Sequence, residues 1–233
     1  YYNHKQSTIN NINHSQGELF FQRIKPRDYD KVFVIGLGKT GTTSLEKILI
    51  DMGFQLGNQA AGEMLIDDYG QKEFHRIVNY YHSAEAFQDI PCSLPEMYRI
   101  IDRSFPKSKF ILTIRDNSEE WFESLIRFHT KIFSSSINPP SDLDLKDANY
   151  RYKSWALHAM QIIFNYPKIP LYEPSHYKSV YEKHINDVKS YFKNREDLQI
   201  INLKDYNSIN QLCKFLGFST PNSYTIPHLN TSK

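Results

Sequence analysis

A short segment of the chain combines glycines, a lysine and a run of hydroxyl side chains. These residues are Gly36, Gly38, Lys39, Thr40, Gly41, Thr42, Thr43 and Ser44. Glycine lets the backbone pass close to a ligand. Lysine adds a positive charge, and hydroxyl groups donate hydrogen bonds. The chemistry that this combination predicts is the binding of a phosphate or a related anion.

The residues on either side predict the elements that hold this loop. The apolar run 32–36 is rich in β-branched residues and is typical of a buried strand. Apolar residues at Leu45, Ile48 and Leu49 predict a helix over residues 43–53. A glycine loop between a strand and a helix places backbone N–H groups and the positive end of the helix dipole in one small volume, where an anion is stabilised.

Two well-known phosphate loops fit the segment less well. In the loop of nucleotide triphosphatases a lysine directly follows the last glycine, but Thr42 occupies that position here. The dinucleotide fingerprint requires an acidic residue about 20 positions further on, whereas Asp67 and Asp68 come later than that.

A second apolar strand, over residues 109–114, leads directly into Arg115. Asn117 and Glu120 have the spacing of a capping box for a helix over residues 118–135. Because ligands of parallel α/β sheets bind beyond the carboxyl ends of the strands, Arg115 is expected on the same edge as the glycine loop. It is predicted to grip a second phosphate, and a surface ion pair with Asp116 or Glu119 is the alternative.

The two motifs resemble those of the sulfotransferase family that uses 3′-phosphoadenosine-5′-phosphosulfate (PAPS). Residues 39–43 resemble its 5′-phosphosulfate loop, K-[ST]-G-T-T, and the stretch FPKSKFILTIRDNSEEWFESL resembles its R-D-P-x-x-W-x-x-S region. The resemblance covers about residues 30–230. It implies PAPS as the sulfuryl donor, with Arg115 on the 3′-phosphate. The residues that it implies around the 5′ end are Gly38, Lys39, Thr40, Gly41, Thr42, Thr43 and Ser44.

The family also uses a serine on the 3′-phosphate, usually eight positions after the arginine. Glu123 occupies that position here, and Ser124 follows one residue later. An extra residue in the turn before the helix would account for this spacing. We therefore assign the role to Ser124 and keep Ser118 as its rival.

Sulfuryl transfer requires a group that meets the charge on the leaving phosphate and a base that takes the proton of the acceptor. The resemblance implies Lys39 for the first role. Asp89, in Asp89-Ile90-Pro91, stands where many family members carry a histidine before an apolar residue and proline, so we predict Asp89 as the base. An aspartate that only caps a turn is the alternative. Rival bases are His82, Glu63, Glu85 and His129. No metal site is expected.

The alternation of strands and helices predicts an α/β fold. The expected domain is a single P-loop-type, three-layer unit with a mostly parallel five-stranded sheet and helices on both faces. The expected strands are 32–36, 54–57, 85–89, 109–114 and 198–203. The expected helices are 43–53, several within 59–83, 94–104, 118–135, 148–165, 178–193 and 207–216, with a loop over 134–147. Residues 1–28 are predicted to be a loosely ordered N-terminal arm, and 29–233 the sulfotransferase-like domain.

Composition narrows the expected partners. Charged residues make up 23% of the chain, the net charge is +2, and there is no basic block of the kind that binds nucleic acid. No apolar stretch reaches the length of a membrane span. The 16 tyrosines and 15 phenylalanines favour an apolar pocket for a small or amphipathic acceptor, with glycan and lipid acceptors left open. Cys92 and Cys213 are expected to be buried thiols, and Trp121, Phe122 and Trp155 to be core residues.

The sequence thus predicts a sulfotransferase that moves a sulfuryl group from PAPS to a hydroxyl or amine of its acceptor. A kinase-like phosphotransferase and a non-catalytic nucleotide-binding module are the alternatives. The expected location is the cytoplasm, or the Golgi lumen if an N-terminal anchor has been removed. An oligomeric state does not follow from the sequence.

Overall fold

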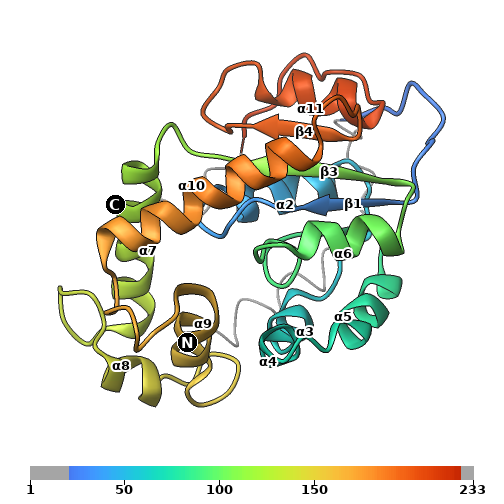
Figure 1. Cartoon of the computed structure of the whole chain (residues 1–233). Coiled ribbons are helices and arrows are strands. Elements are labelled where there is room, and N and C mark those ends of the chain that lie inside the picture. Colours follow the sequence, from blue (N-terminus) through green and yellow to red (C-terminus); the bar gives the residue numbers. More distant parts are fainter. Residues whose placement is uncertain (1–20, 227–233) are drawn as a thin grey trace.

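The sheet at the centre of the molecule is parallel throughout the residues that the computed structural model describes, 21–226 (Figure 1). Its strands are β1 (Lys31–Val34), β2 (Ala86–Phe87), β3 (Ser108–Thr113) and β4 (Leu198–Ile201), in the order β2-β1-β3-β4. β1 pairs with β3 from Lys31 opposite Ser108 to Val34 opposite Ile111. The predicted α/β class is confirmed.

The sheet has four strands rather than the predicted five. Residues 55–57 do approach β2, and the Gly57 amide donates to the Ala86 carbonyl at 2.9 Å, but they form only an isolated bridge between Leu56 and Ala86. The pairing stops there because both partners turn away. Asn58 caps the next helix, and Asp89 adopts the left-handed conformation with φ 58° shortly after β2.

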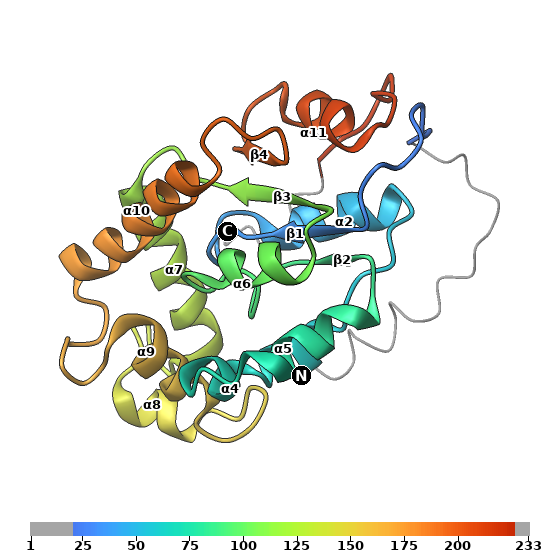
Figure 2. The ribbon, with the colours of Figure 1, turned by 45° about the vertical axis from the view of Figure 1, so that its right-hand side comes forward.

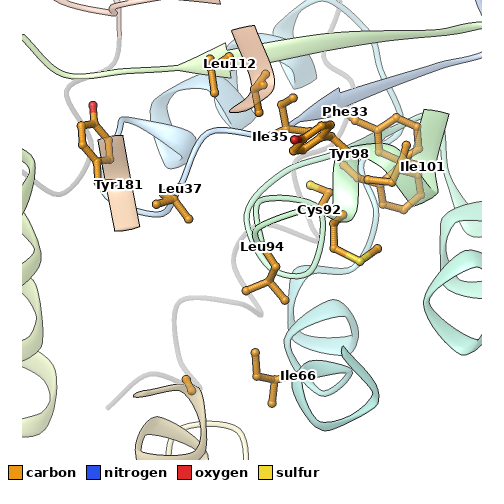
Figure 3. Packing of buried hydrophobic residues seen from close by; sticks show 14 of the residues in the cluster. Phe33, Ile35, Leu37, Ile66, Cys92, Leu94, Tyr98, Ile101, Leu112 and Tyr181 are labelled. Carbon is orange, nitrogen blue, oxygen red and sulfur yellow. The ribbon is translucent and has the colours of Figure 1, made fainter. Parts of the chain in front are cut away.

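Side chains alternate along the sheet and so build two apolar layers. Val32 and Val34 pack with helices α2 (Thr42–Asp51) and α11 (Ser208–Leu216). Phe33 and Ile35 face the opposite side and pack in the cluster that includes Tyr98 and Ile101 of α6 (Met97–Ser104), as Figure 3 shows. Helix α10 (Pro174–Tyr191) contributes Tyr181 and Val188 to the same cluster. The predicted three-layer arrangement is therefore present.

The remaining helices form a group away from β4 and α11 (Figures 1 and 2). They are α3 (Gln59–Glu63), α4 (Ile66–Gly70), α5 (Phe74–Tyr80) with a following 3-10 turn η1 (Tyr81–Ser83), α7 (Ser118–Phe133), α8 (Asp142–Asp147) and α9 (Trp155–Phe164). α7 packs against α10, and α9 packs against α8 and α4. Three of these helices, α3, α7 and α9, line the cavity described below.

Three of the predicted helix boundaries are wrong. α8 lies within the predicted loop 134–147, because Ser141 and Asp144 cap each other's backbone in a reciprocal capping box. The helix predicted from residue 148 begins only at Trp155, after a turn closed by a bridge between Asn149 and Lys153. α10 begins at Pro174, before the expected residue 178, because proline suits the first turn of a helix.

The described part of the predicted arm, residues 21–28, packs against the end of α11. Phe21 is 3% exposed, and the Ile24 amide donates to the Gly217 carbonyl at 2.9 Å. The Arg23 guanidinium lies 4.3 Å from the centre of the Phe218 ring. The rest of the predicted arm, residues 1–20, lies outside the described residues.

Candidate active site

The glycine loop joins the end of β1 to the N-terminus of α2, as the sequence predicted. Gly36 lies so close to β3 that a Cβ atom there would approach the Thr113 hydroxyl oxygen to 2.2 Å. Lys39 and Gly41 both have positive φ, 73° and 99°. Gly41 is the N-cap of α2, and no side chain among the described residues caps this helix. The loop therefore presents the positive end of α2 to a ligand.

Lys39 extends from the loop over an aromatic ring. Its Nζ atom lies 3.4 Å from the centre of the Phe128 ring on α7. Burial lowers the pKa of the Lys39 ammonium to about 8, while Asp89 opposes this shift and Arg115 adds to it. The lysine is thus a poorly hydrated cation, and a bound anion would compensate its lost hydration.

Asp89 reaches the same place from the end of β2. Its Oδ2 accepts a 3.1 Å hydrogen bond from the Thr42 hydroxyl, and its Oδ1 accepts one of 2.9 Å from the Ile90 amide. A Cβ atom on Gly38 would lie 3.5 Å from Oδ1, so the carboxyl group rests directly against the loop. Burial raises the pKa of Asp89, whereas Lys39 and the two hydrogen bonds act in the opposite direction.

The hydroxyl groups of the loop divide into two sets. Thr42 and Thr43 line the cavity in front of the loop together with Gly38 and Lys39. The Thr40 hydroxyl turns inward, where it donates to the Leu37 carbonyl at 2.6 Å and lies 2.5 Å from the Thr113 hydroxyl. Ser44 is 8% exposed. The Thr40 side chain therefore connects the loop to β3, and only the Thr40 backbone is available to a ligand.

Arg115 follows the end of β3 and contacts the backbone of the glycine loop. Its Nε donates to the Lys39 carbonyl at 2.9 Å, and its Nη1 pairs with Glu120 at 3.2 Å. Its backbone amide donates to the Tyr181 hydroxyl at 2.9 Å. The Arg115 side chain is 25% exposed and does not line the cavity. The structure thus brings Arg115 to the loop, as predicted, but outside the lining of the cavity.

The two candidate serines on α7 differ in their surroundings. Asn117 caps α7 by accepting from the Glu120 amide at 2.8 Å, and Ser118, at the first position of the helix, donates its hydroxyl to Glu182. The Ser124 hydroxyl makes no hydrogen bond with any residue that the structure describes. It also follows the buried Trp121 by three residues and so shares its face of the helix, whereas Glu123 is exposed.

Trp121 is 1% exposed, as expected of a core residue, but it also holds the loop. Its indole Nε1 donates to the Gly38 carbonyl at 2.9 Å, and its ring stacks on Tyr181 with 4.7 Å between centres. The sequence predicted Trp121 only as a core residue and did not indicate this contact with the loop. The available signal was its spacing from Phe128, since residues seven apart lie on one face of a helix.

A cavity of about 550 Å³ lies in front of the loop. Its polar end is lined by the loop and by Glu46, Gln59, Glu63, Gln88 and Asp89. Its apolar walls come from α7 and α9: Trp121, Leu125, Phe128, Phe133, Trp155, Ala156, Ala159, Met160, Ile163 and Phe164. This size and this mixture of apolar walls with a few polar groups are typical of small-molecule sites.

The rival bases fall into two groups. Glu63 and His129 line the cavity together with Asp89, whereas His82 and Glu85 do not. His82 is exposed and packs against Phe105, and Glu85 pairs with Arg27 at 2.6 Å. The Phe122 and Trp155 side chains are 9% and 6% exposed, as expected of core residues.

The two rivals inside the cavity are each engaged with a neighbour. Glu63 is 7% exposed and forms an ion pair with Arg151. Arg151 was not among the residues predicted for the site. Burial and the nearby Asp89 raise the pKa of Glu63 to about 7, although Arg151 opposes the shift. His129 lies 3.1 Å from the Tyr172 hydroxyl, and burial together with Lys39 lowers its pKa to about 3. His129 is thus neutral at physiological pH.

Residues 21–226 contain neither a cluster of metal-ligating side chains nor a helix suited to span a membrane. No three His, Cys, Asp or Glu side chains in this range are grouped so that they could hold a metal ion. No helix in the same range has the length and apolar character that a membrane span needs.

One comparison with known proteins identifies a family for this chain. A search of curated proteins gave no match. The family model described as "Sulfotransferase domain" matches residues 31–233, which include the glycine loop, Asp89, Arg115 and the whole cavity. The chain therefore belongs to the sulfotransferase domain family.

Proposed function

We propose that the protein transfers a sulfuryl group from PAPS to a hydroxyl or amine of a small or amphipathic acceptor. One observation carries the proposal: Lys39 and Asp89 line the same cavity, where the Thr42 hydroxyl at the N-terminus of α2 donates to the Asp89 carboxyl. The Lys39 ammonium can stabilise the negative charge of the leaving phosphate, and the Asp89 carboxylate can accept the proton of the acceptor.

The residues around the loop fit the donor. The N-terminus of α2, Lys39 and the hydroxyls of Thr42 and Thr43 are donors for the 5′-phosphosulfate, with backbone contacts from Gly38, Thr40 and Gly41 and with Ser44 in the first turn of α2. Arg115 and Ser124 are proposed for the 3′-phosphate, because a guanidinium and a free hydroxyl are both strong phosphate ligands. When bound, PAPS supplies the sulfuryl group and the phosphate leaving group.

The chain's own residues then have three tasks. Asp89 accepts the proton of the acceptor as its oxygen or nitrogen bonds to sulfur. Lys39 stabilises the negative charge that remains on the phosphate oxygen as the bond from sulfur to that oxygen breaks, an effect that typically contributes about 3 kcal/mol for one preorganised donor. The apolar walls from α7 and α9 exclude water, which would compete as an acceptor.

Calorimetric titration tests the donor site directly. The protein is titrated with 3′,5′-adenosine bisphosphate, with 5′-AMP, and with ATP plus magnesium. We expect the bisphosphate to bind at least tenfold more tightly than 5′-AMP, because only the bisphosphate offers a 3′-phosphate to Arg115. A preference for ATP with magnesium would instead support the kinase-like alternative and overturn the proposal.

Turnover separates an enzyme from a non-catalytic binding module. PAPS is incubated with the protein and a panel of phenols, alcohols and amines, and the release of the bisphosphate is measured. Acceptor-dependent release supports transfer. Tight binding of the bisphosphate without release on any member of a broad panel would support the binding module.

A further inference from the structure

The polar end of the cavity contains an amide oxygen without a partner. Gln88 lines the cavity and is 8% exposed, and its Oε1 atom makes no hydrogen bond with any described residue. A buried oxygen in this position favours a ligand that brings a hydrogen-bond donor.

The neighbouring amide fixes which atom of Gln88 is unpaired. The Nε2 atom of Gln59 donates to the Ile90 carbonyl at 3.0 Å and to Glu63 at 3.3 Å. The Oε1 atom of Gln59 therefore faces Gln88, and the Nε2 atom of Gln88 donates to it at 3.3 Å. Reversing the Gln88 amide would set two oxygens against each other, so its Oε1 is the atom that remains.

The charged groups around this amide are mainly acidic. Glu46, Glu63 and Asp89 all line the cavity, and Asp89 contributes to the raised pKa of both glutamates, so the three carboxyl groups repel one another. Glu63 is paired with Arg151, and Asp89 has Thr42 and the nearby Lys39. Glu46 is half-buried, and its carboxyl group has no hydrogen bond or ion pair with a described residue.

We infer that the acceptor is an amphipathic amine. The amine enters as an ammonium ion, which donates to Gln88 Oε1 and lies against the Glu46 carboxylate, and its apolar tail packs along the walls from α7 and α9. Before transfer the ammonium gives one proton to Glu46; the neutral nitrogen then bonds to sulfur as the bond from sulfur to the leaving phosphate breaks, and Asp89 accepts the second proton. The inference rests on the proposed function, since it names the acceptor class of the same cavity. A neutral head would leave Glu46 uncompensated, and a carboxylate head would add a further negative charge.

Three probes with one tail and different heads test the inference: decylamine, decanol and decanoate. Each is titrated into the whole protein with saturating 3′,5′-adenosine bisphosphate and again without it. We expect decylamine to bind about tenfold more tightly than decanol, with decanoate weakest. Equal binding of decylamine and decanol, or tighter binding of decanoate, would overturn the inference.

Variants locate the head group. Glu46→Gln keeps the shape of the side chain but removes its charge, and it should lower the affinity for decylamine about tenfold while leaving that for decanol unchanged. Gln88→Leu, which removes the acceptor oxygen, should also reduce the preference for decylamine. Glu123→Gln, an exposed site on α7, is the matched control and should change nothing. An unchanged preference in Glu46→Gln would contradict the inference.

The inference and the proposed function fail in different ways. If the bisphosphate binds but decylamine has no advantage, the amine acceptor is wrong and the donor site stands. If the bisphosphate does not bind, the PAPS proposal fails, while the titrations without nucleotide still measure whether the cavity prefers an amine.

Discussion

The indole N–H of Trp121 donates a 2.9 Å hydrogen bond to the carbonyl oxygen of Gly38, although the two residues are 83 positions apart. This bond ties α7 to the loop that carries Lys39. Because Phe128, which lies under the Lys39 ammonium, is on the same helix, α7 supports both the backbone and the side chain of the loop.

Trp121→Phe removes this bond but keeps an aromatic ring on Tyr181. We expect the loop to lose about 1 kcal/mol of hydrogen-bond stabilisation, so that 3′,5′-adenosine bisphosphate binds roughly fivefold more weakly. Titration calorimetry measures the change. Trp155→Phe is the control, because its indole donates to Glu63 at 2.8 Å and not to the loop. If both variants weakened the nucleotide equally, a specific role for Trp121 would be excluded.

Nucleotide binding should depend on pH through Lys39. The pKa of its ammonium in the free protein is about 8, and a bound phosphate raises it towards its usual range. Between about pH 8 and 10 binding therefore takes up a proton, and affinity falls with rising pH by at most about tenfold per unit. Titrations at pH 9 in buffers of different ionisation enthalpy measure the uptake. Lys39→Met should abolish it, and uptake that persists in this variant would assign the proton to another group.

Arg115→Ala should remove the preference for a 3′-phosphate. Both nucleotides lose the bond from Arg115 Nε to the Lys39 carbonyl, but we expect the bisphosphate to lose at least tenfold more affinity than 5′-AMP, because only the bisphosphate carries the group that Arg115 is proposed to hold. Ser124→Ala should have a smaller effect in the same direction, and Ser118→Ala none. A loss in Ser118→Ala but not in Ser124→Ala would reverse our assignment of the two serines.

Asp89→Asn should abolish turnover while the bisphosphate still binds. The variant keeps two polar atoms beside Thr42 and Ile90 but loses the group that takes the acceptor's proton, so we expect a rate at least about a hundredfold lower. Glu63→Gln is the comparison, because Glu63 lines the cavity in an ion pair with Arg151. A larger loss of rate in Glu63→Gln than in Asp89→Asn would identify Glu63 as the base.

Gly36→Ala should strongly destabilise the protein. The added methyl group would lie 2.2 Å from the Thr113 hydroxyl and 2.4 Å from its carbonyl oxygen, so β1 and β3 would have to separate. We expect a loss of about 3 kcal/mol or more in the free energy of unfolding, measured with urea. Gly53→Ala is the control: it has a positive φ of 87° but open space, so only backbone strain of about 1–2 kcal/mol is expected.

The parts of the site that the sequence predicted well are local. The strand, the glycine loop and the start of α2 are encoded within a few consecutive residues, and the capping of α7 by Asn117 lies in another short segment. The prediction of a fifth strand over residues 54–57 was wrong because the pairing of these residues depends on how far β2 extends. β2 ends shortly before Asp89, where the chain turns. Local propensity contains no information about the length of the partner strand.

The cavity walls were beyond sequence reasoning for a similar reason. Glu63 and Arg151 are 88 residues apart, and their ion pair exists only because α3 and the turn before α9 meet in the folded chain. Neither residue lies in a motif. The sequence also did not indicate which loop hydroxyls face the cavity and which turn inward. The inward orientation of Thr40 depends on its contact with Thr113 of β3.

The bond between Thr42 and Asp89 links donor binding to the basicity of the site. A hydroxyl group can donate one hydrogen bond, and in the free protein Thr42 donates it to Asp89. Burial raises the pKa of Asp89, and this hydrogen bond opposes the rise. If Thr42 turns to a bound phosphosulfate, Asp89 loses this donor and gains a neighbouring negative charge, and both effects increase its affinity for a proton. The arrival of the donor would then activate the base, so that Asp89 draws a proton most strongly when there is a sulfuryl group to transfer.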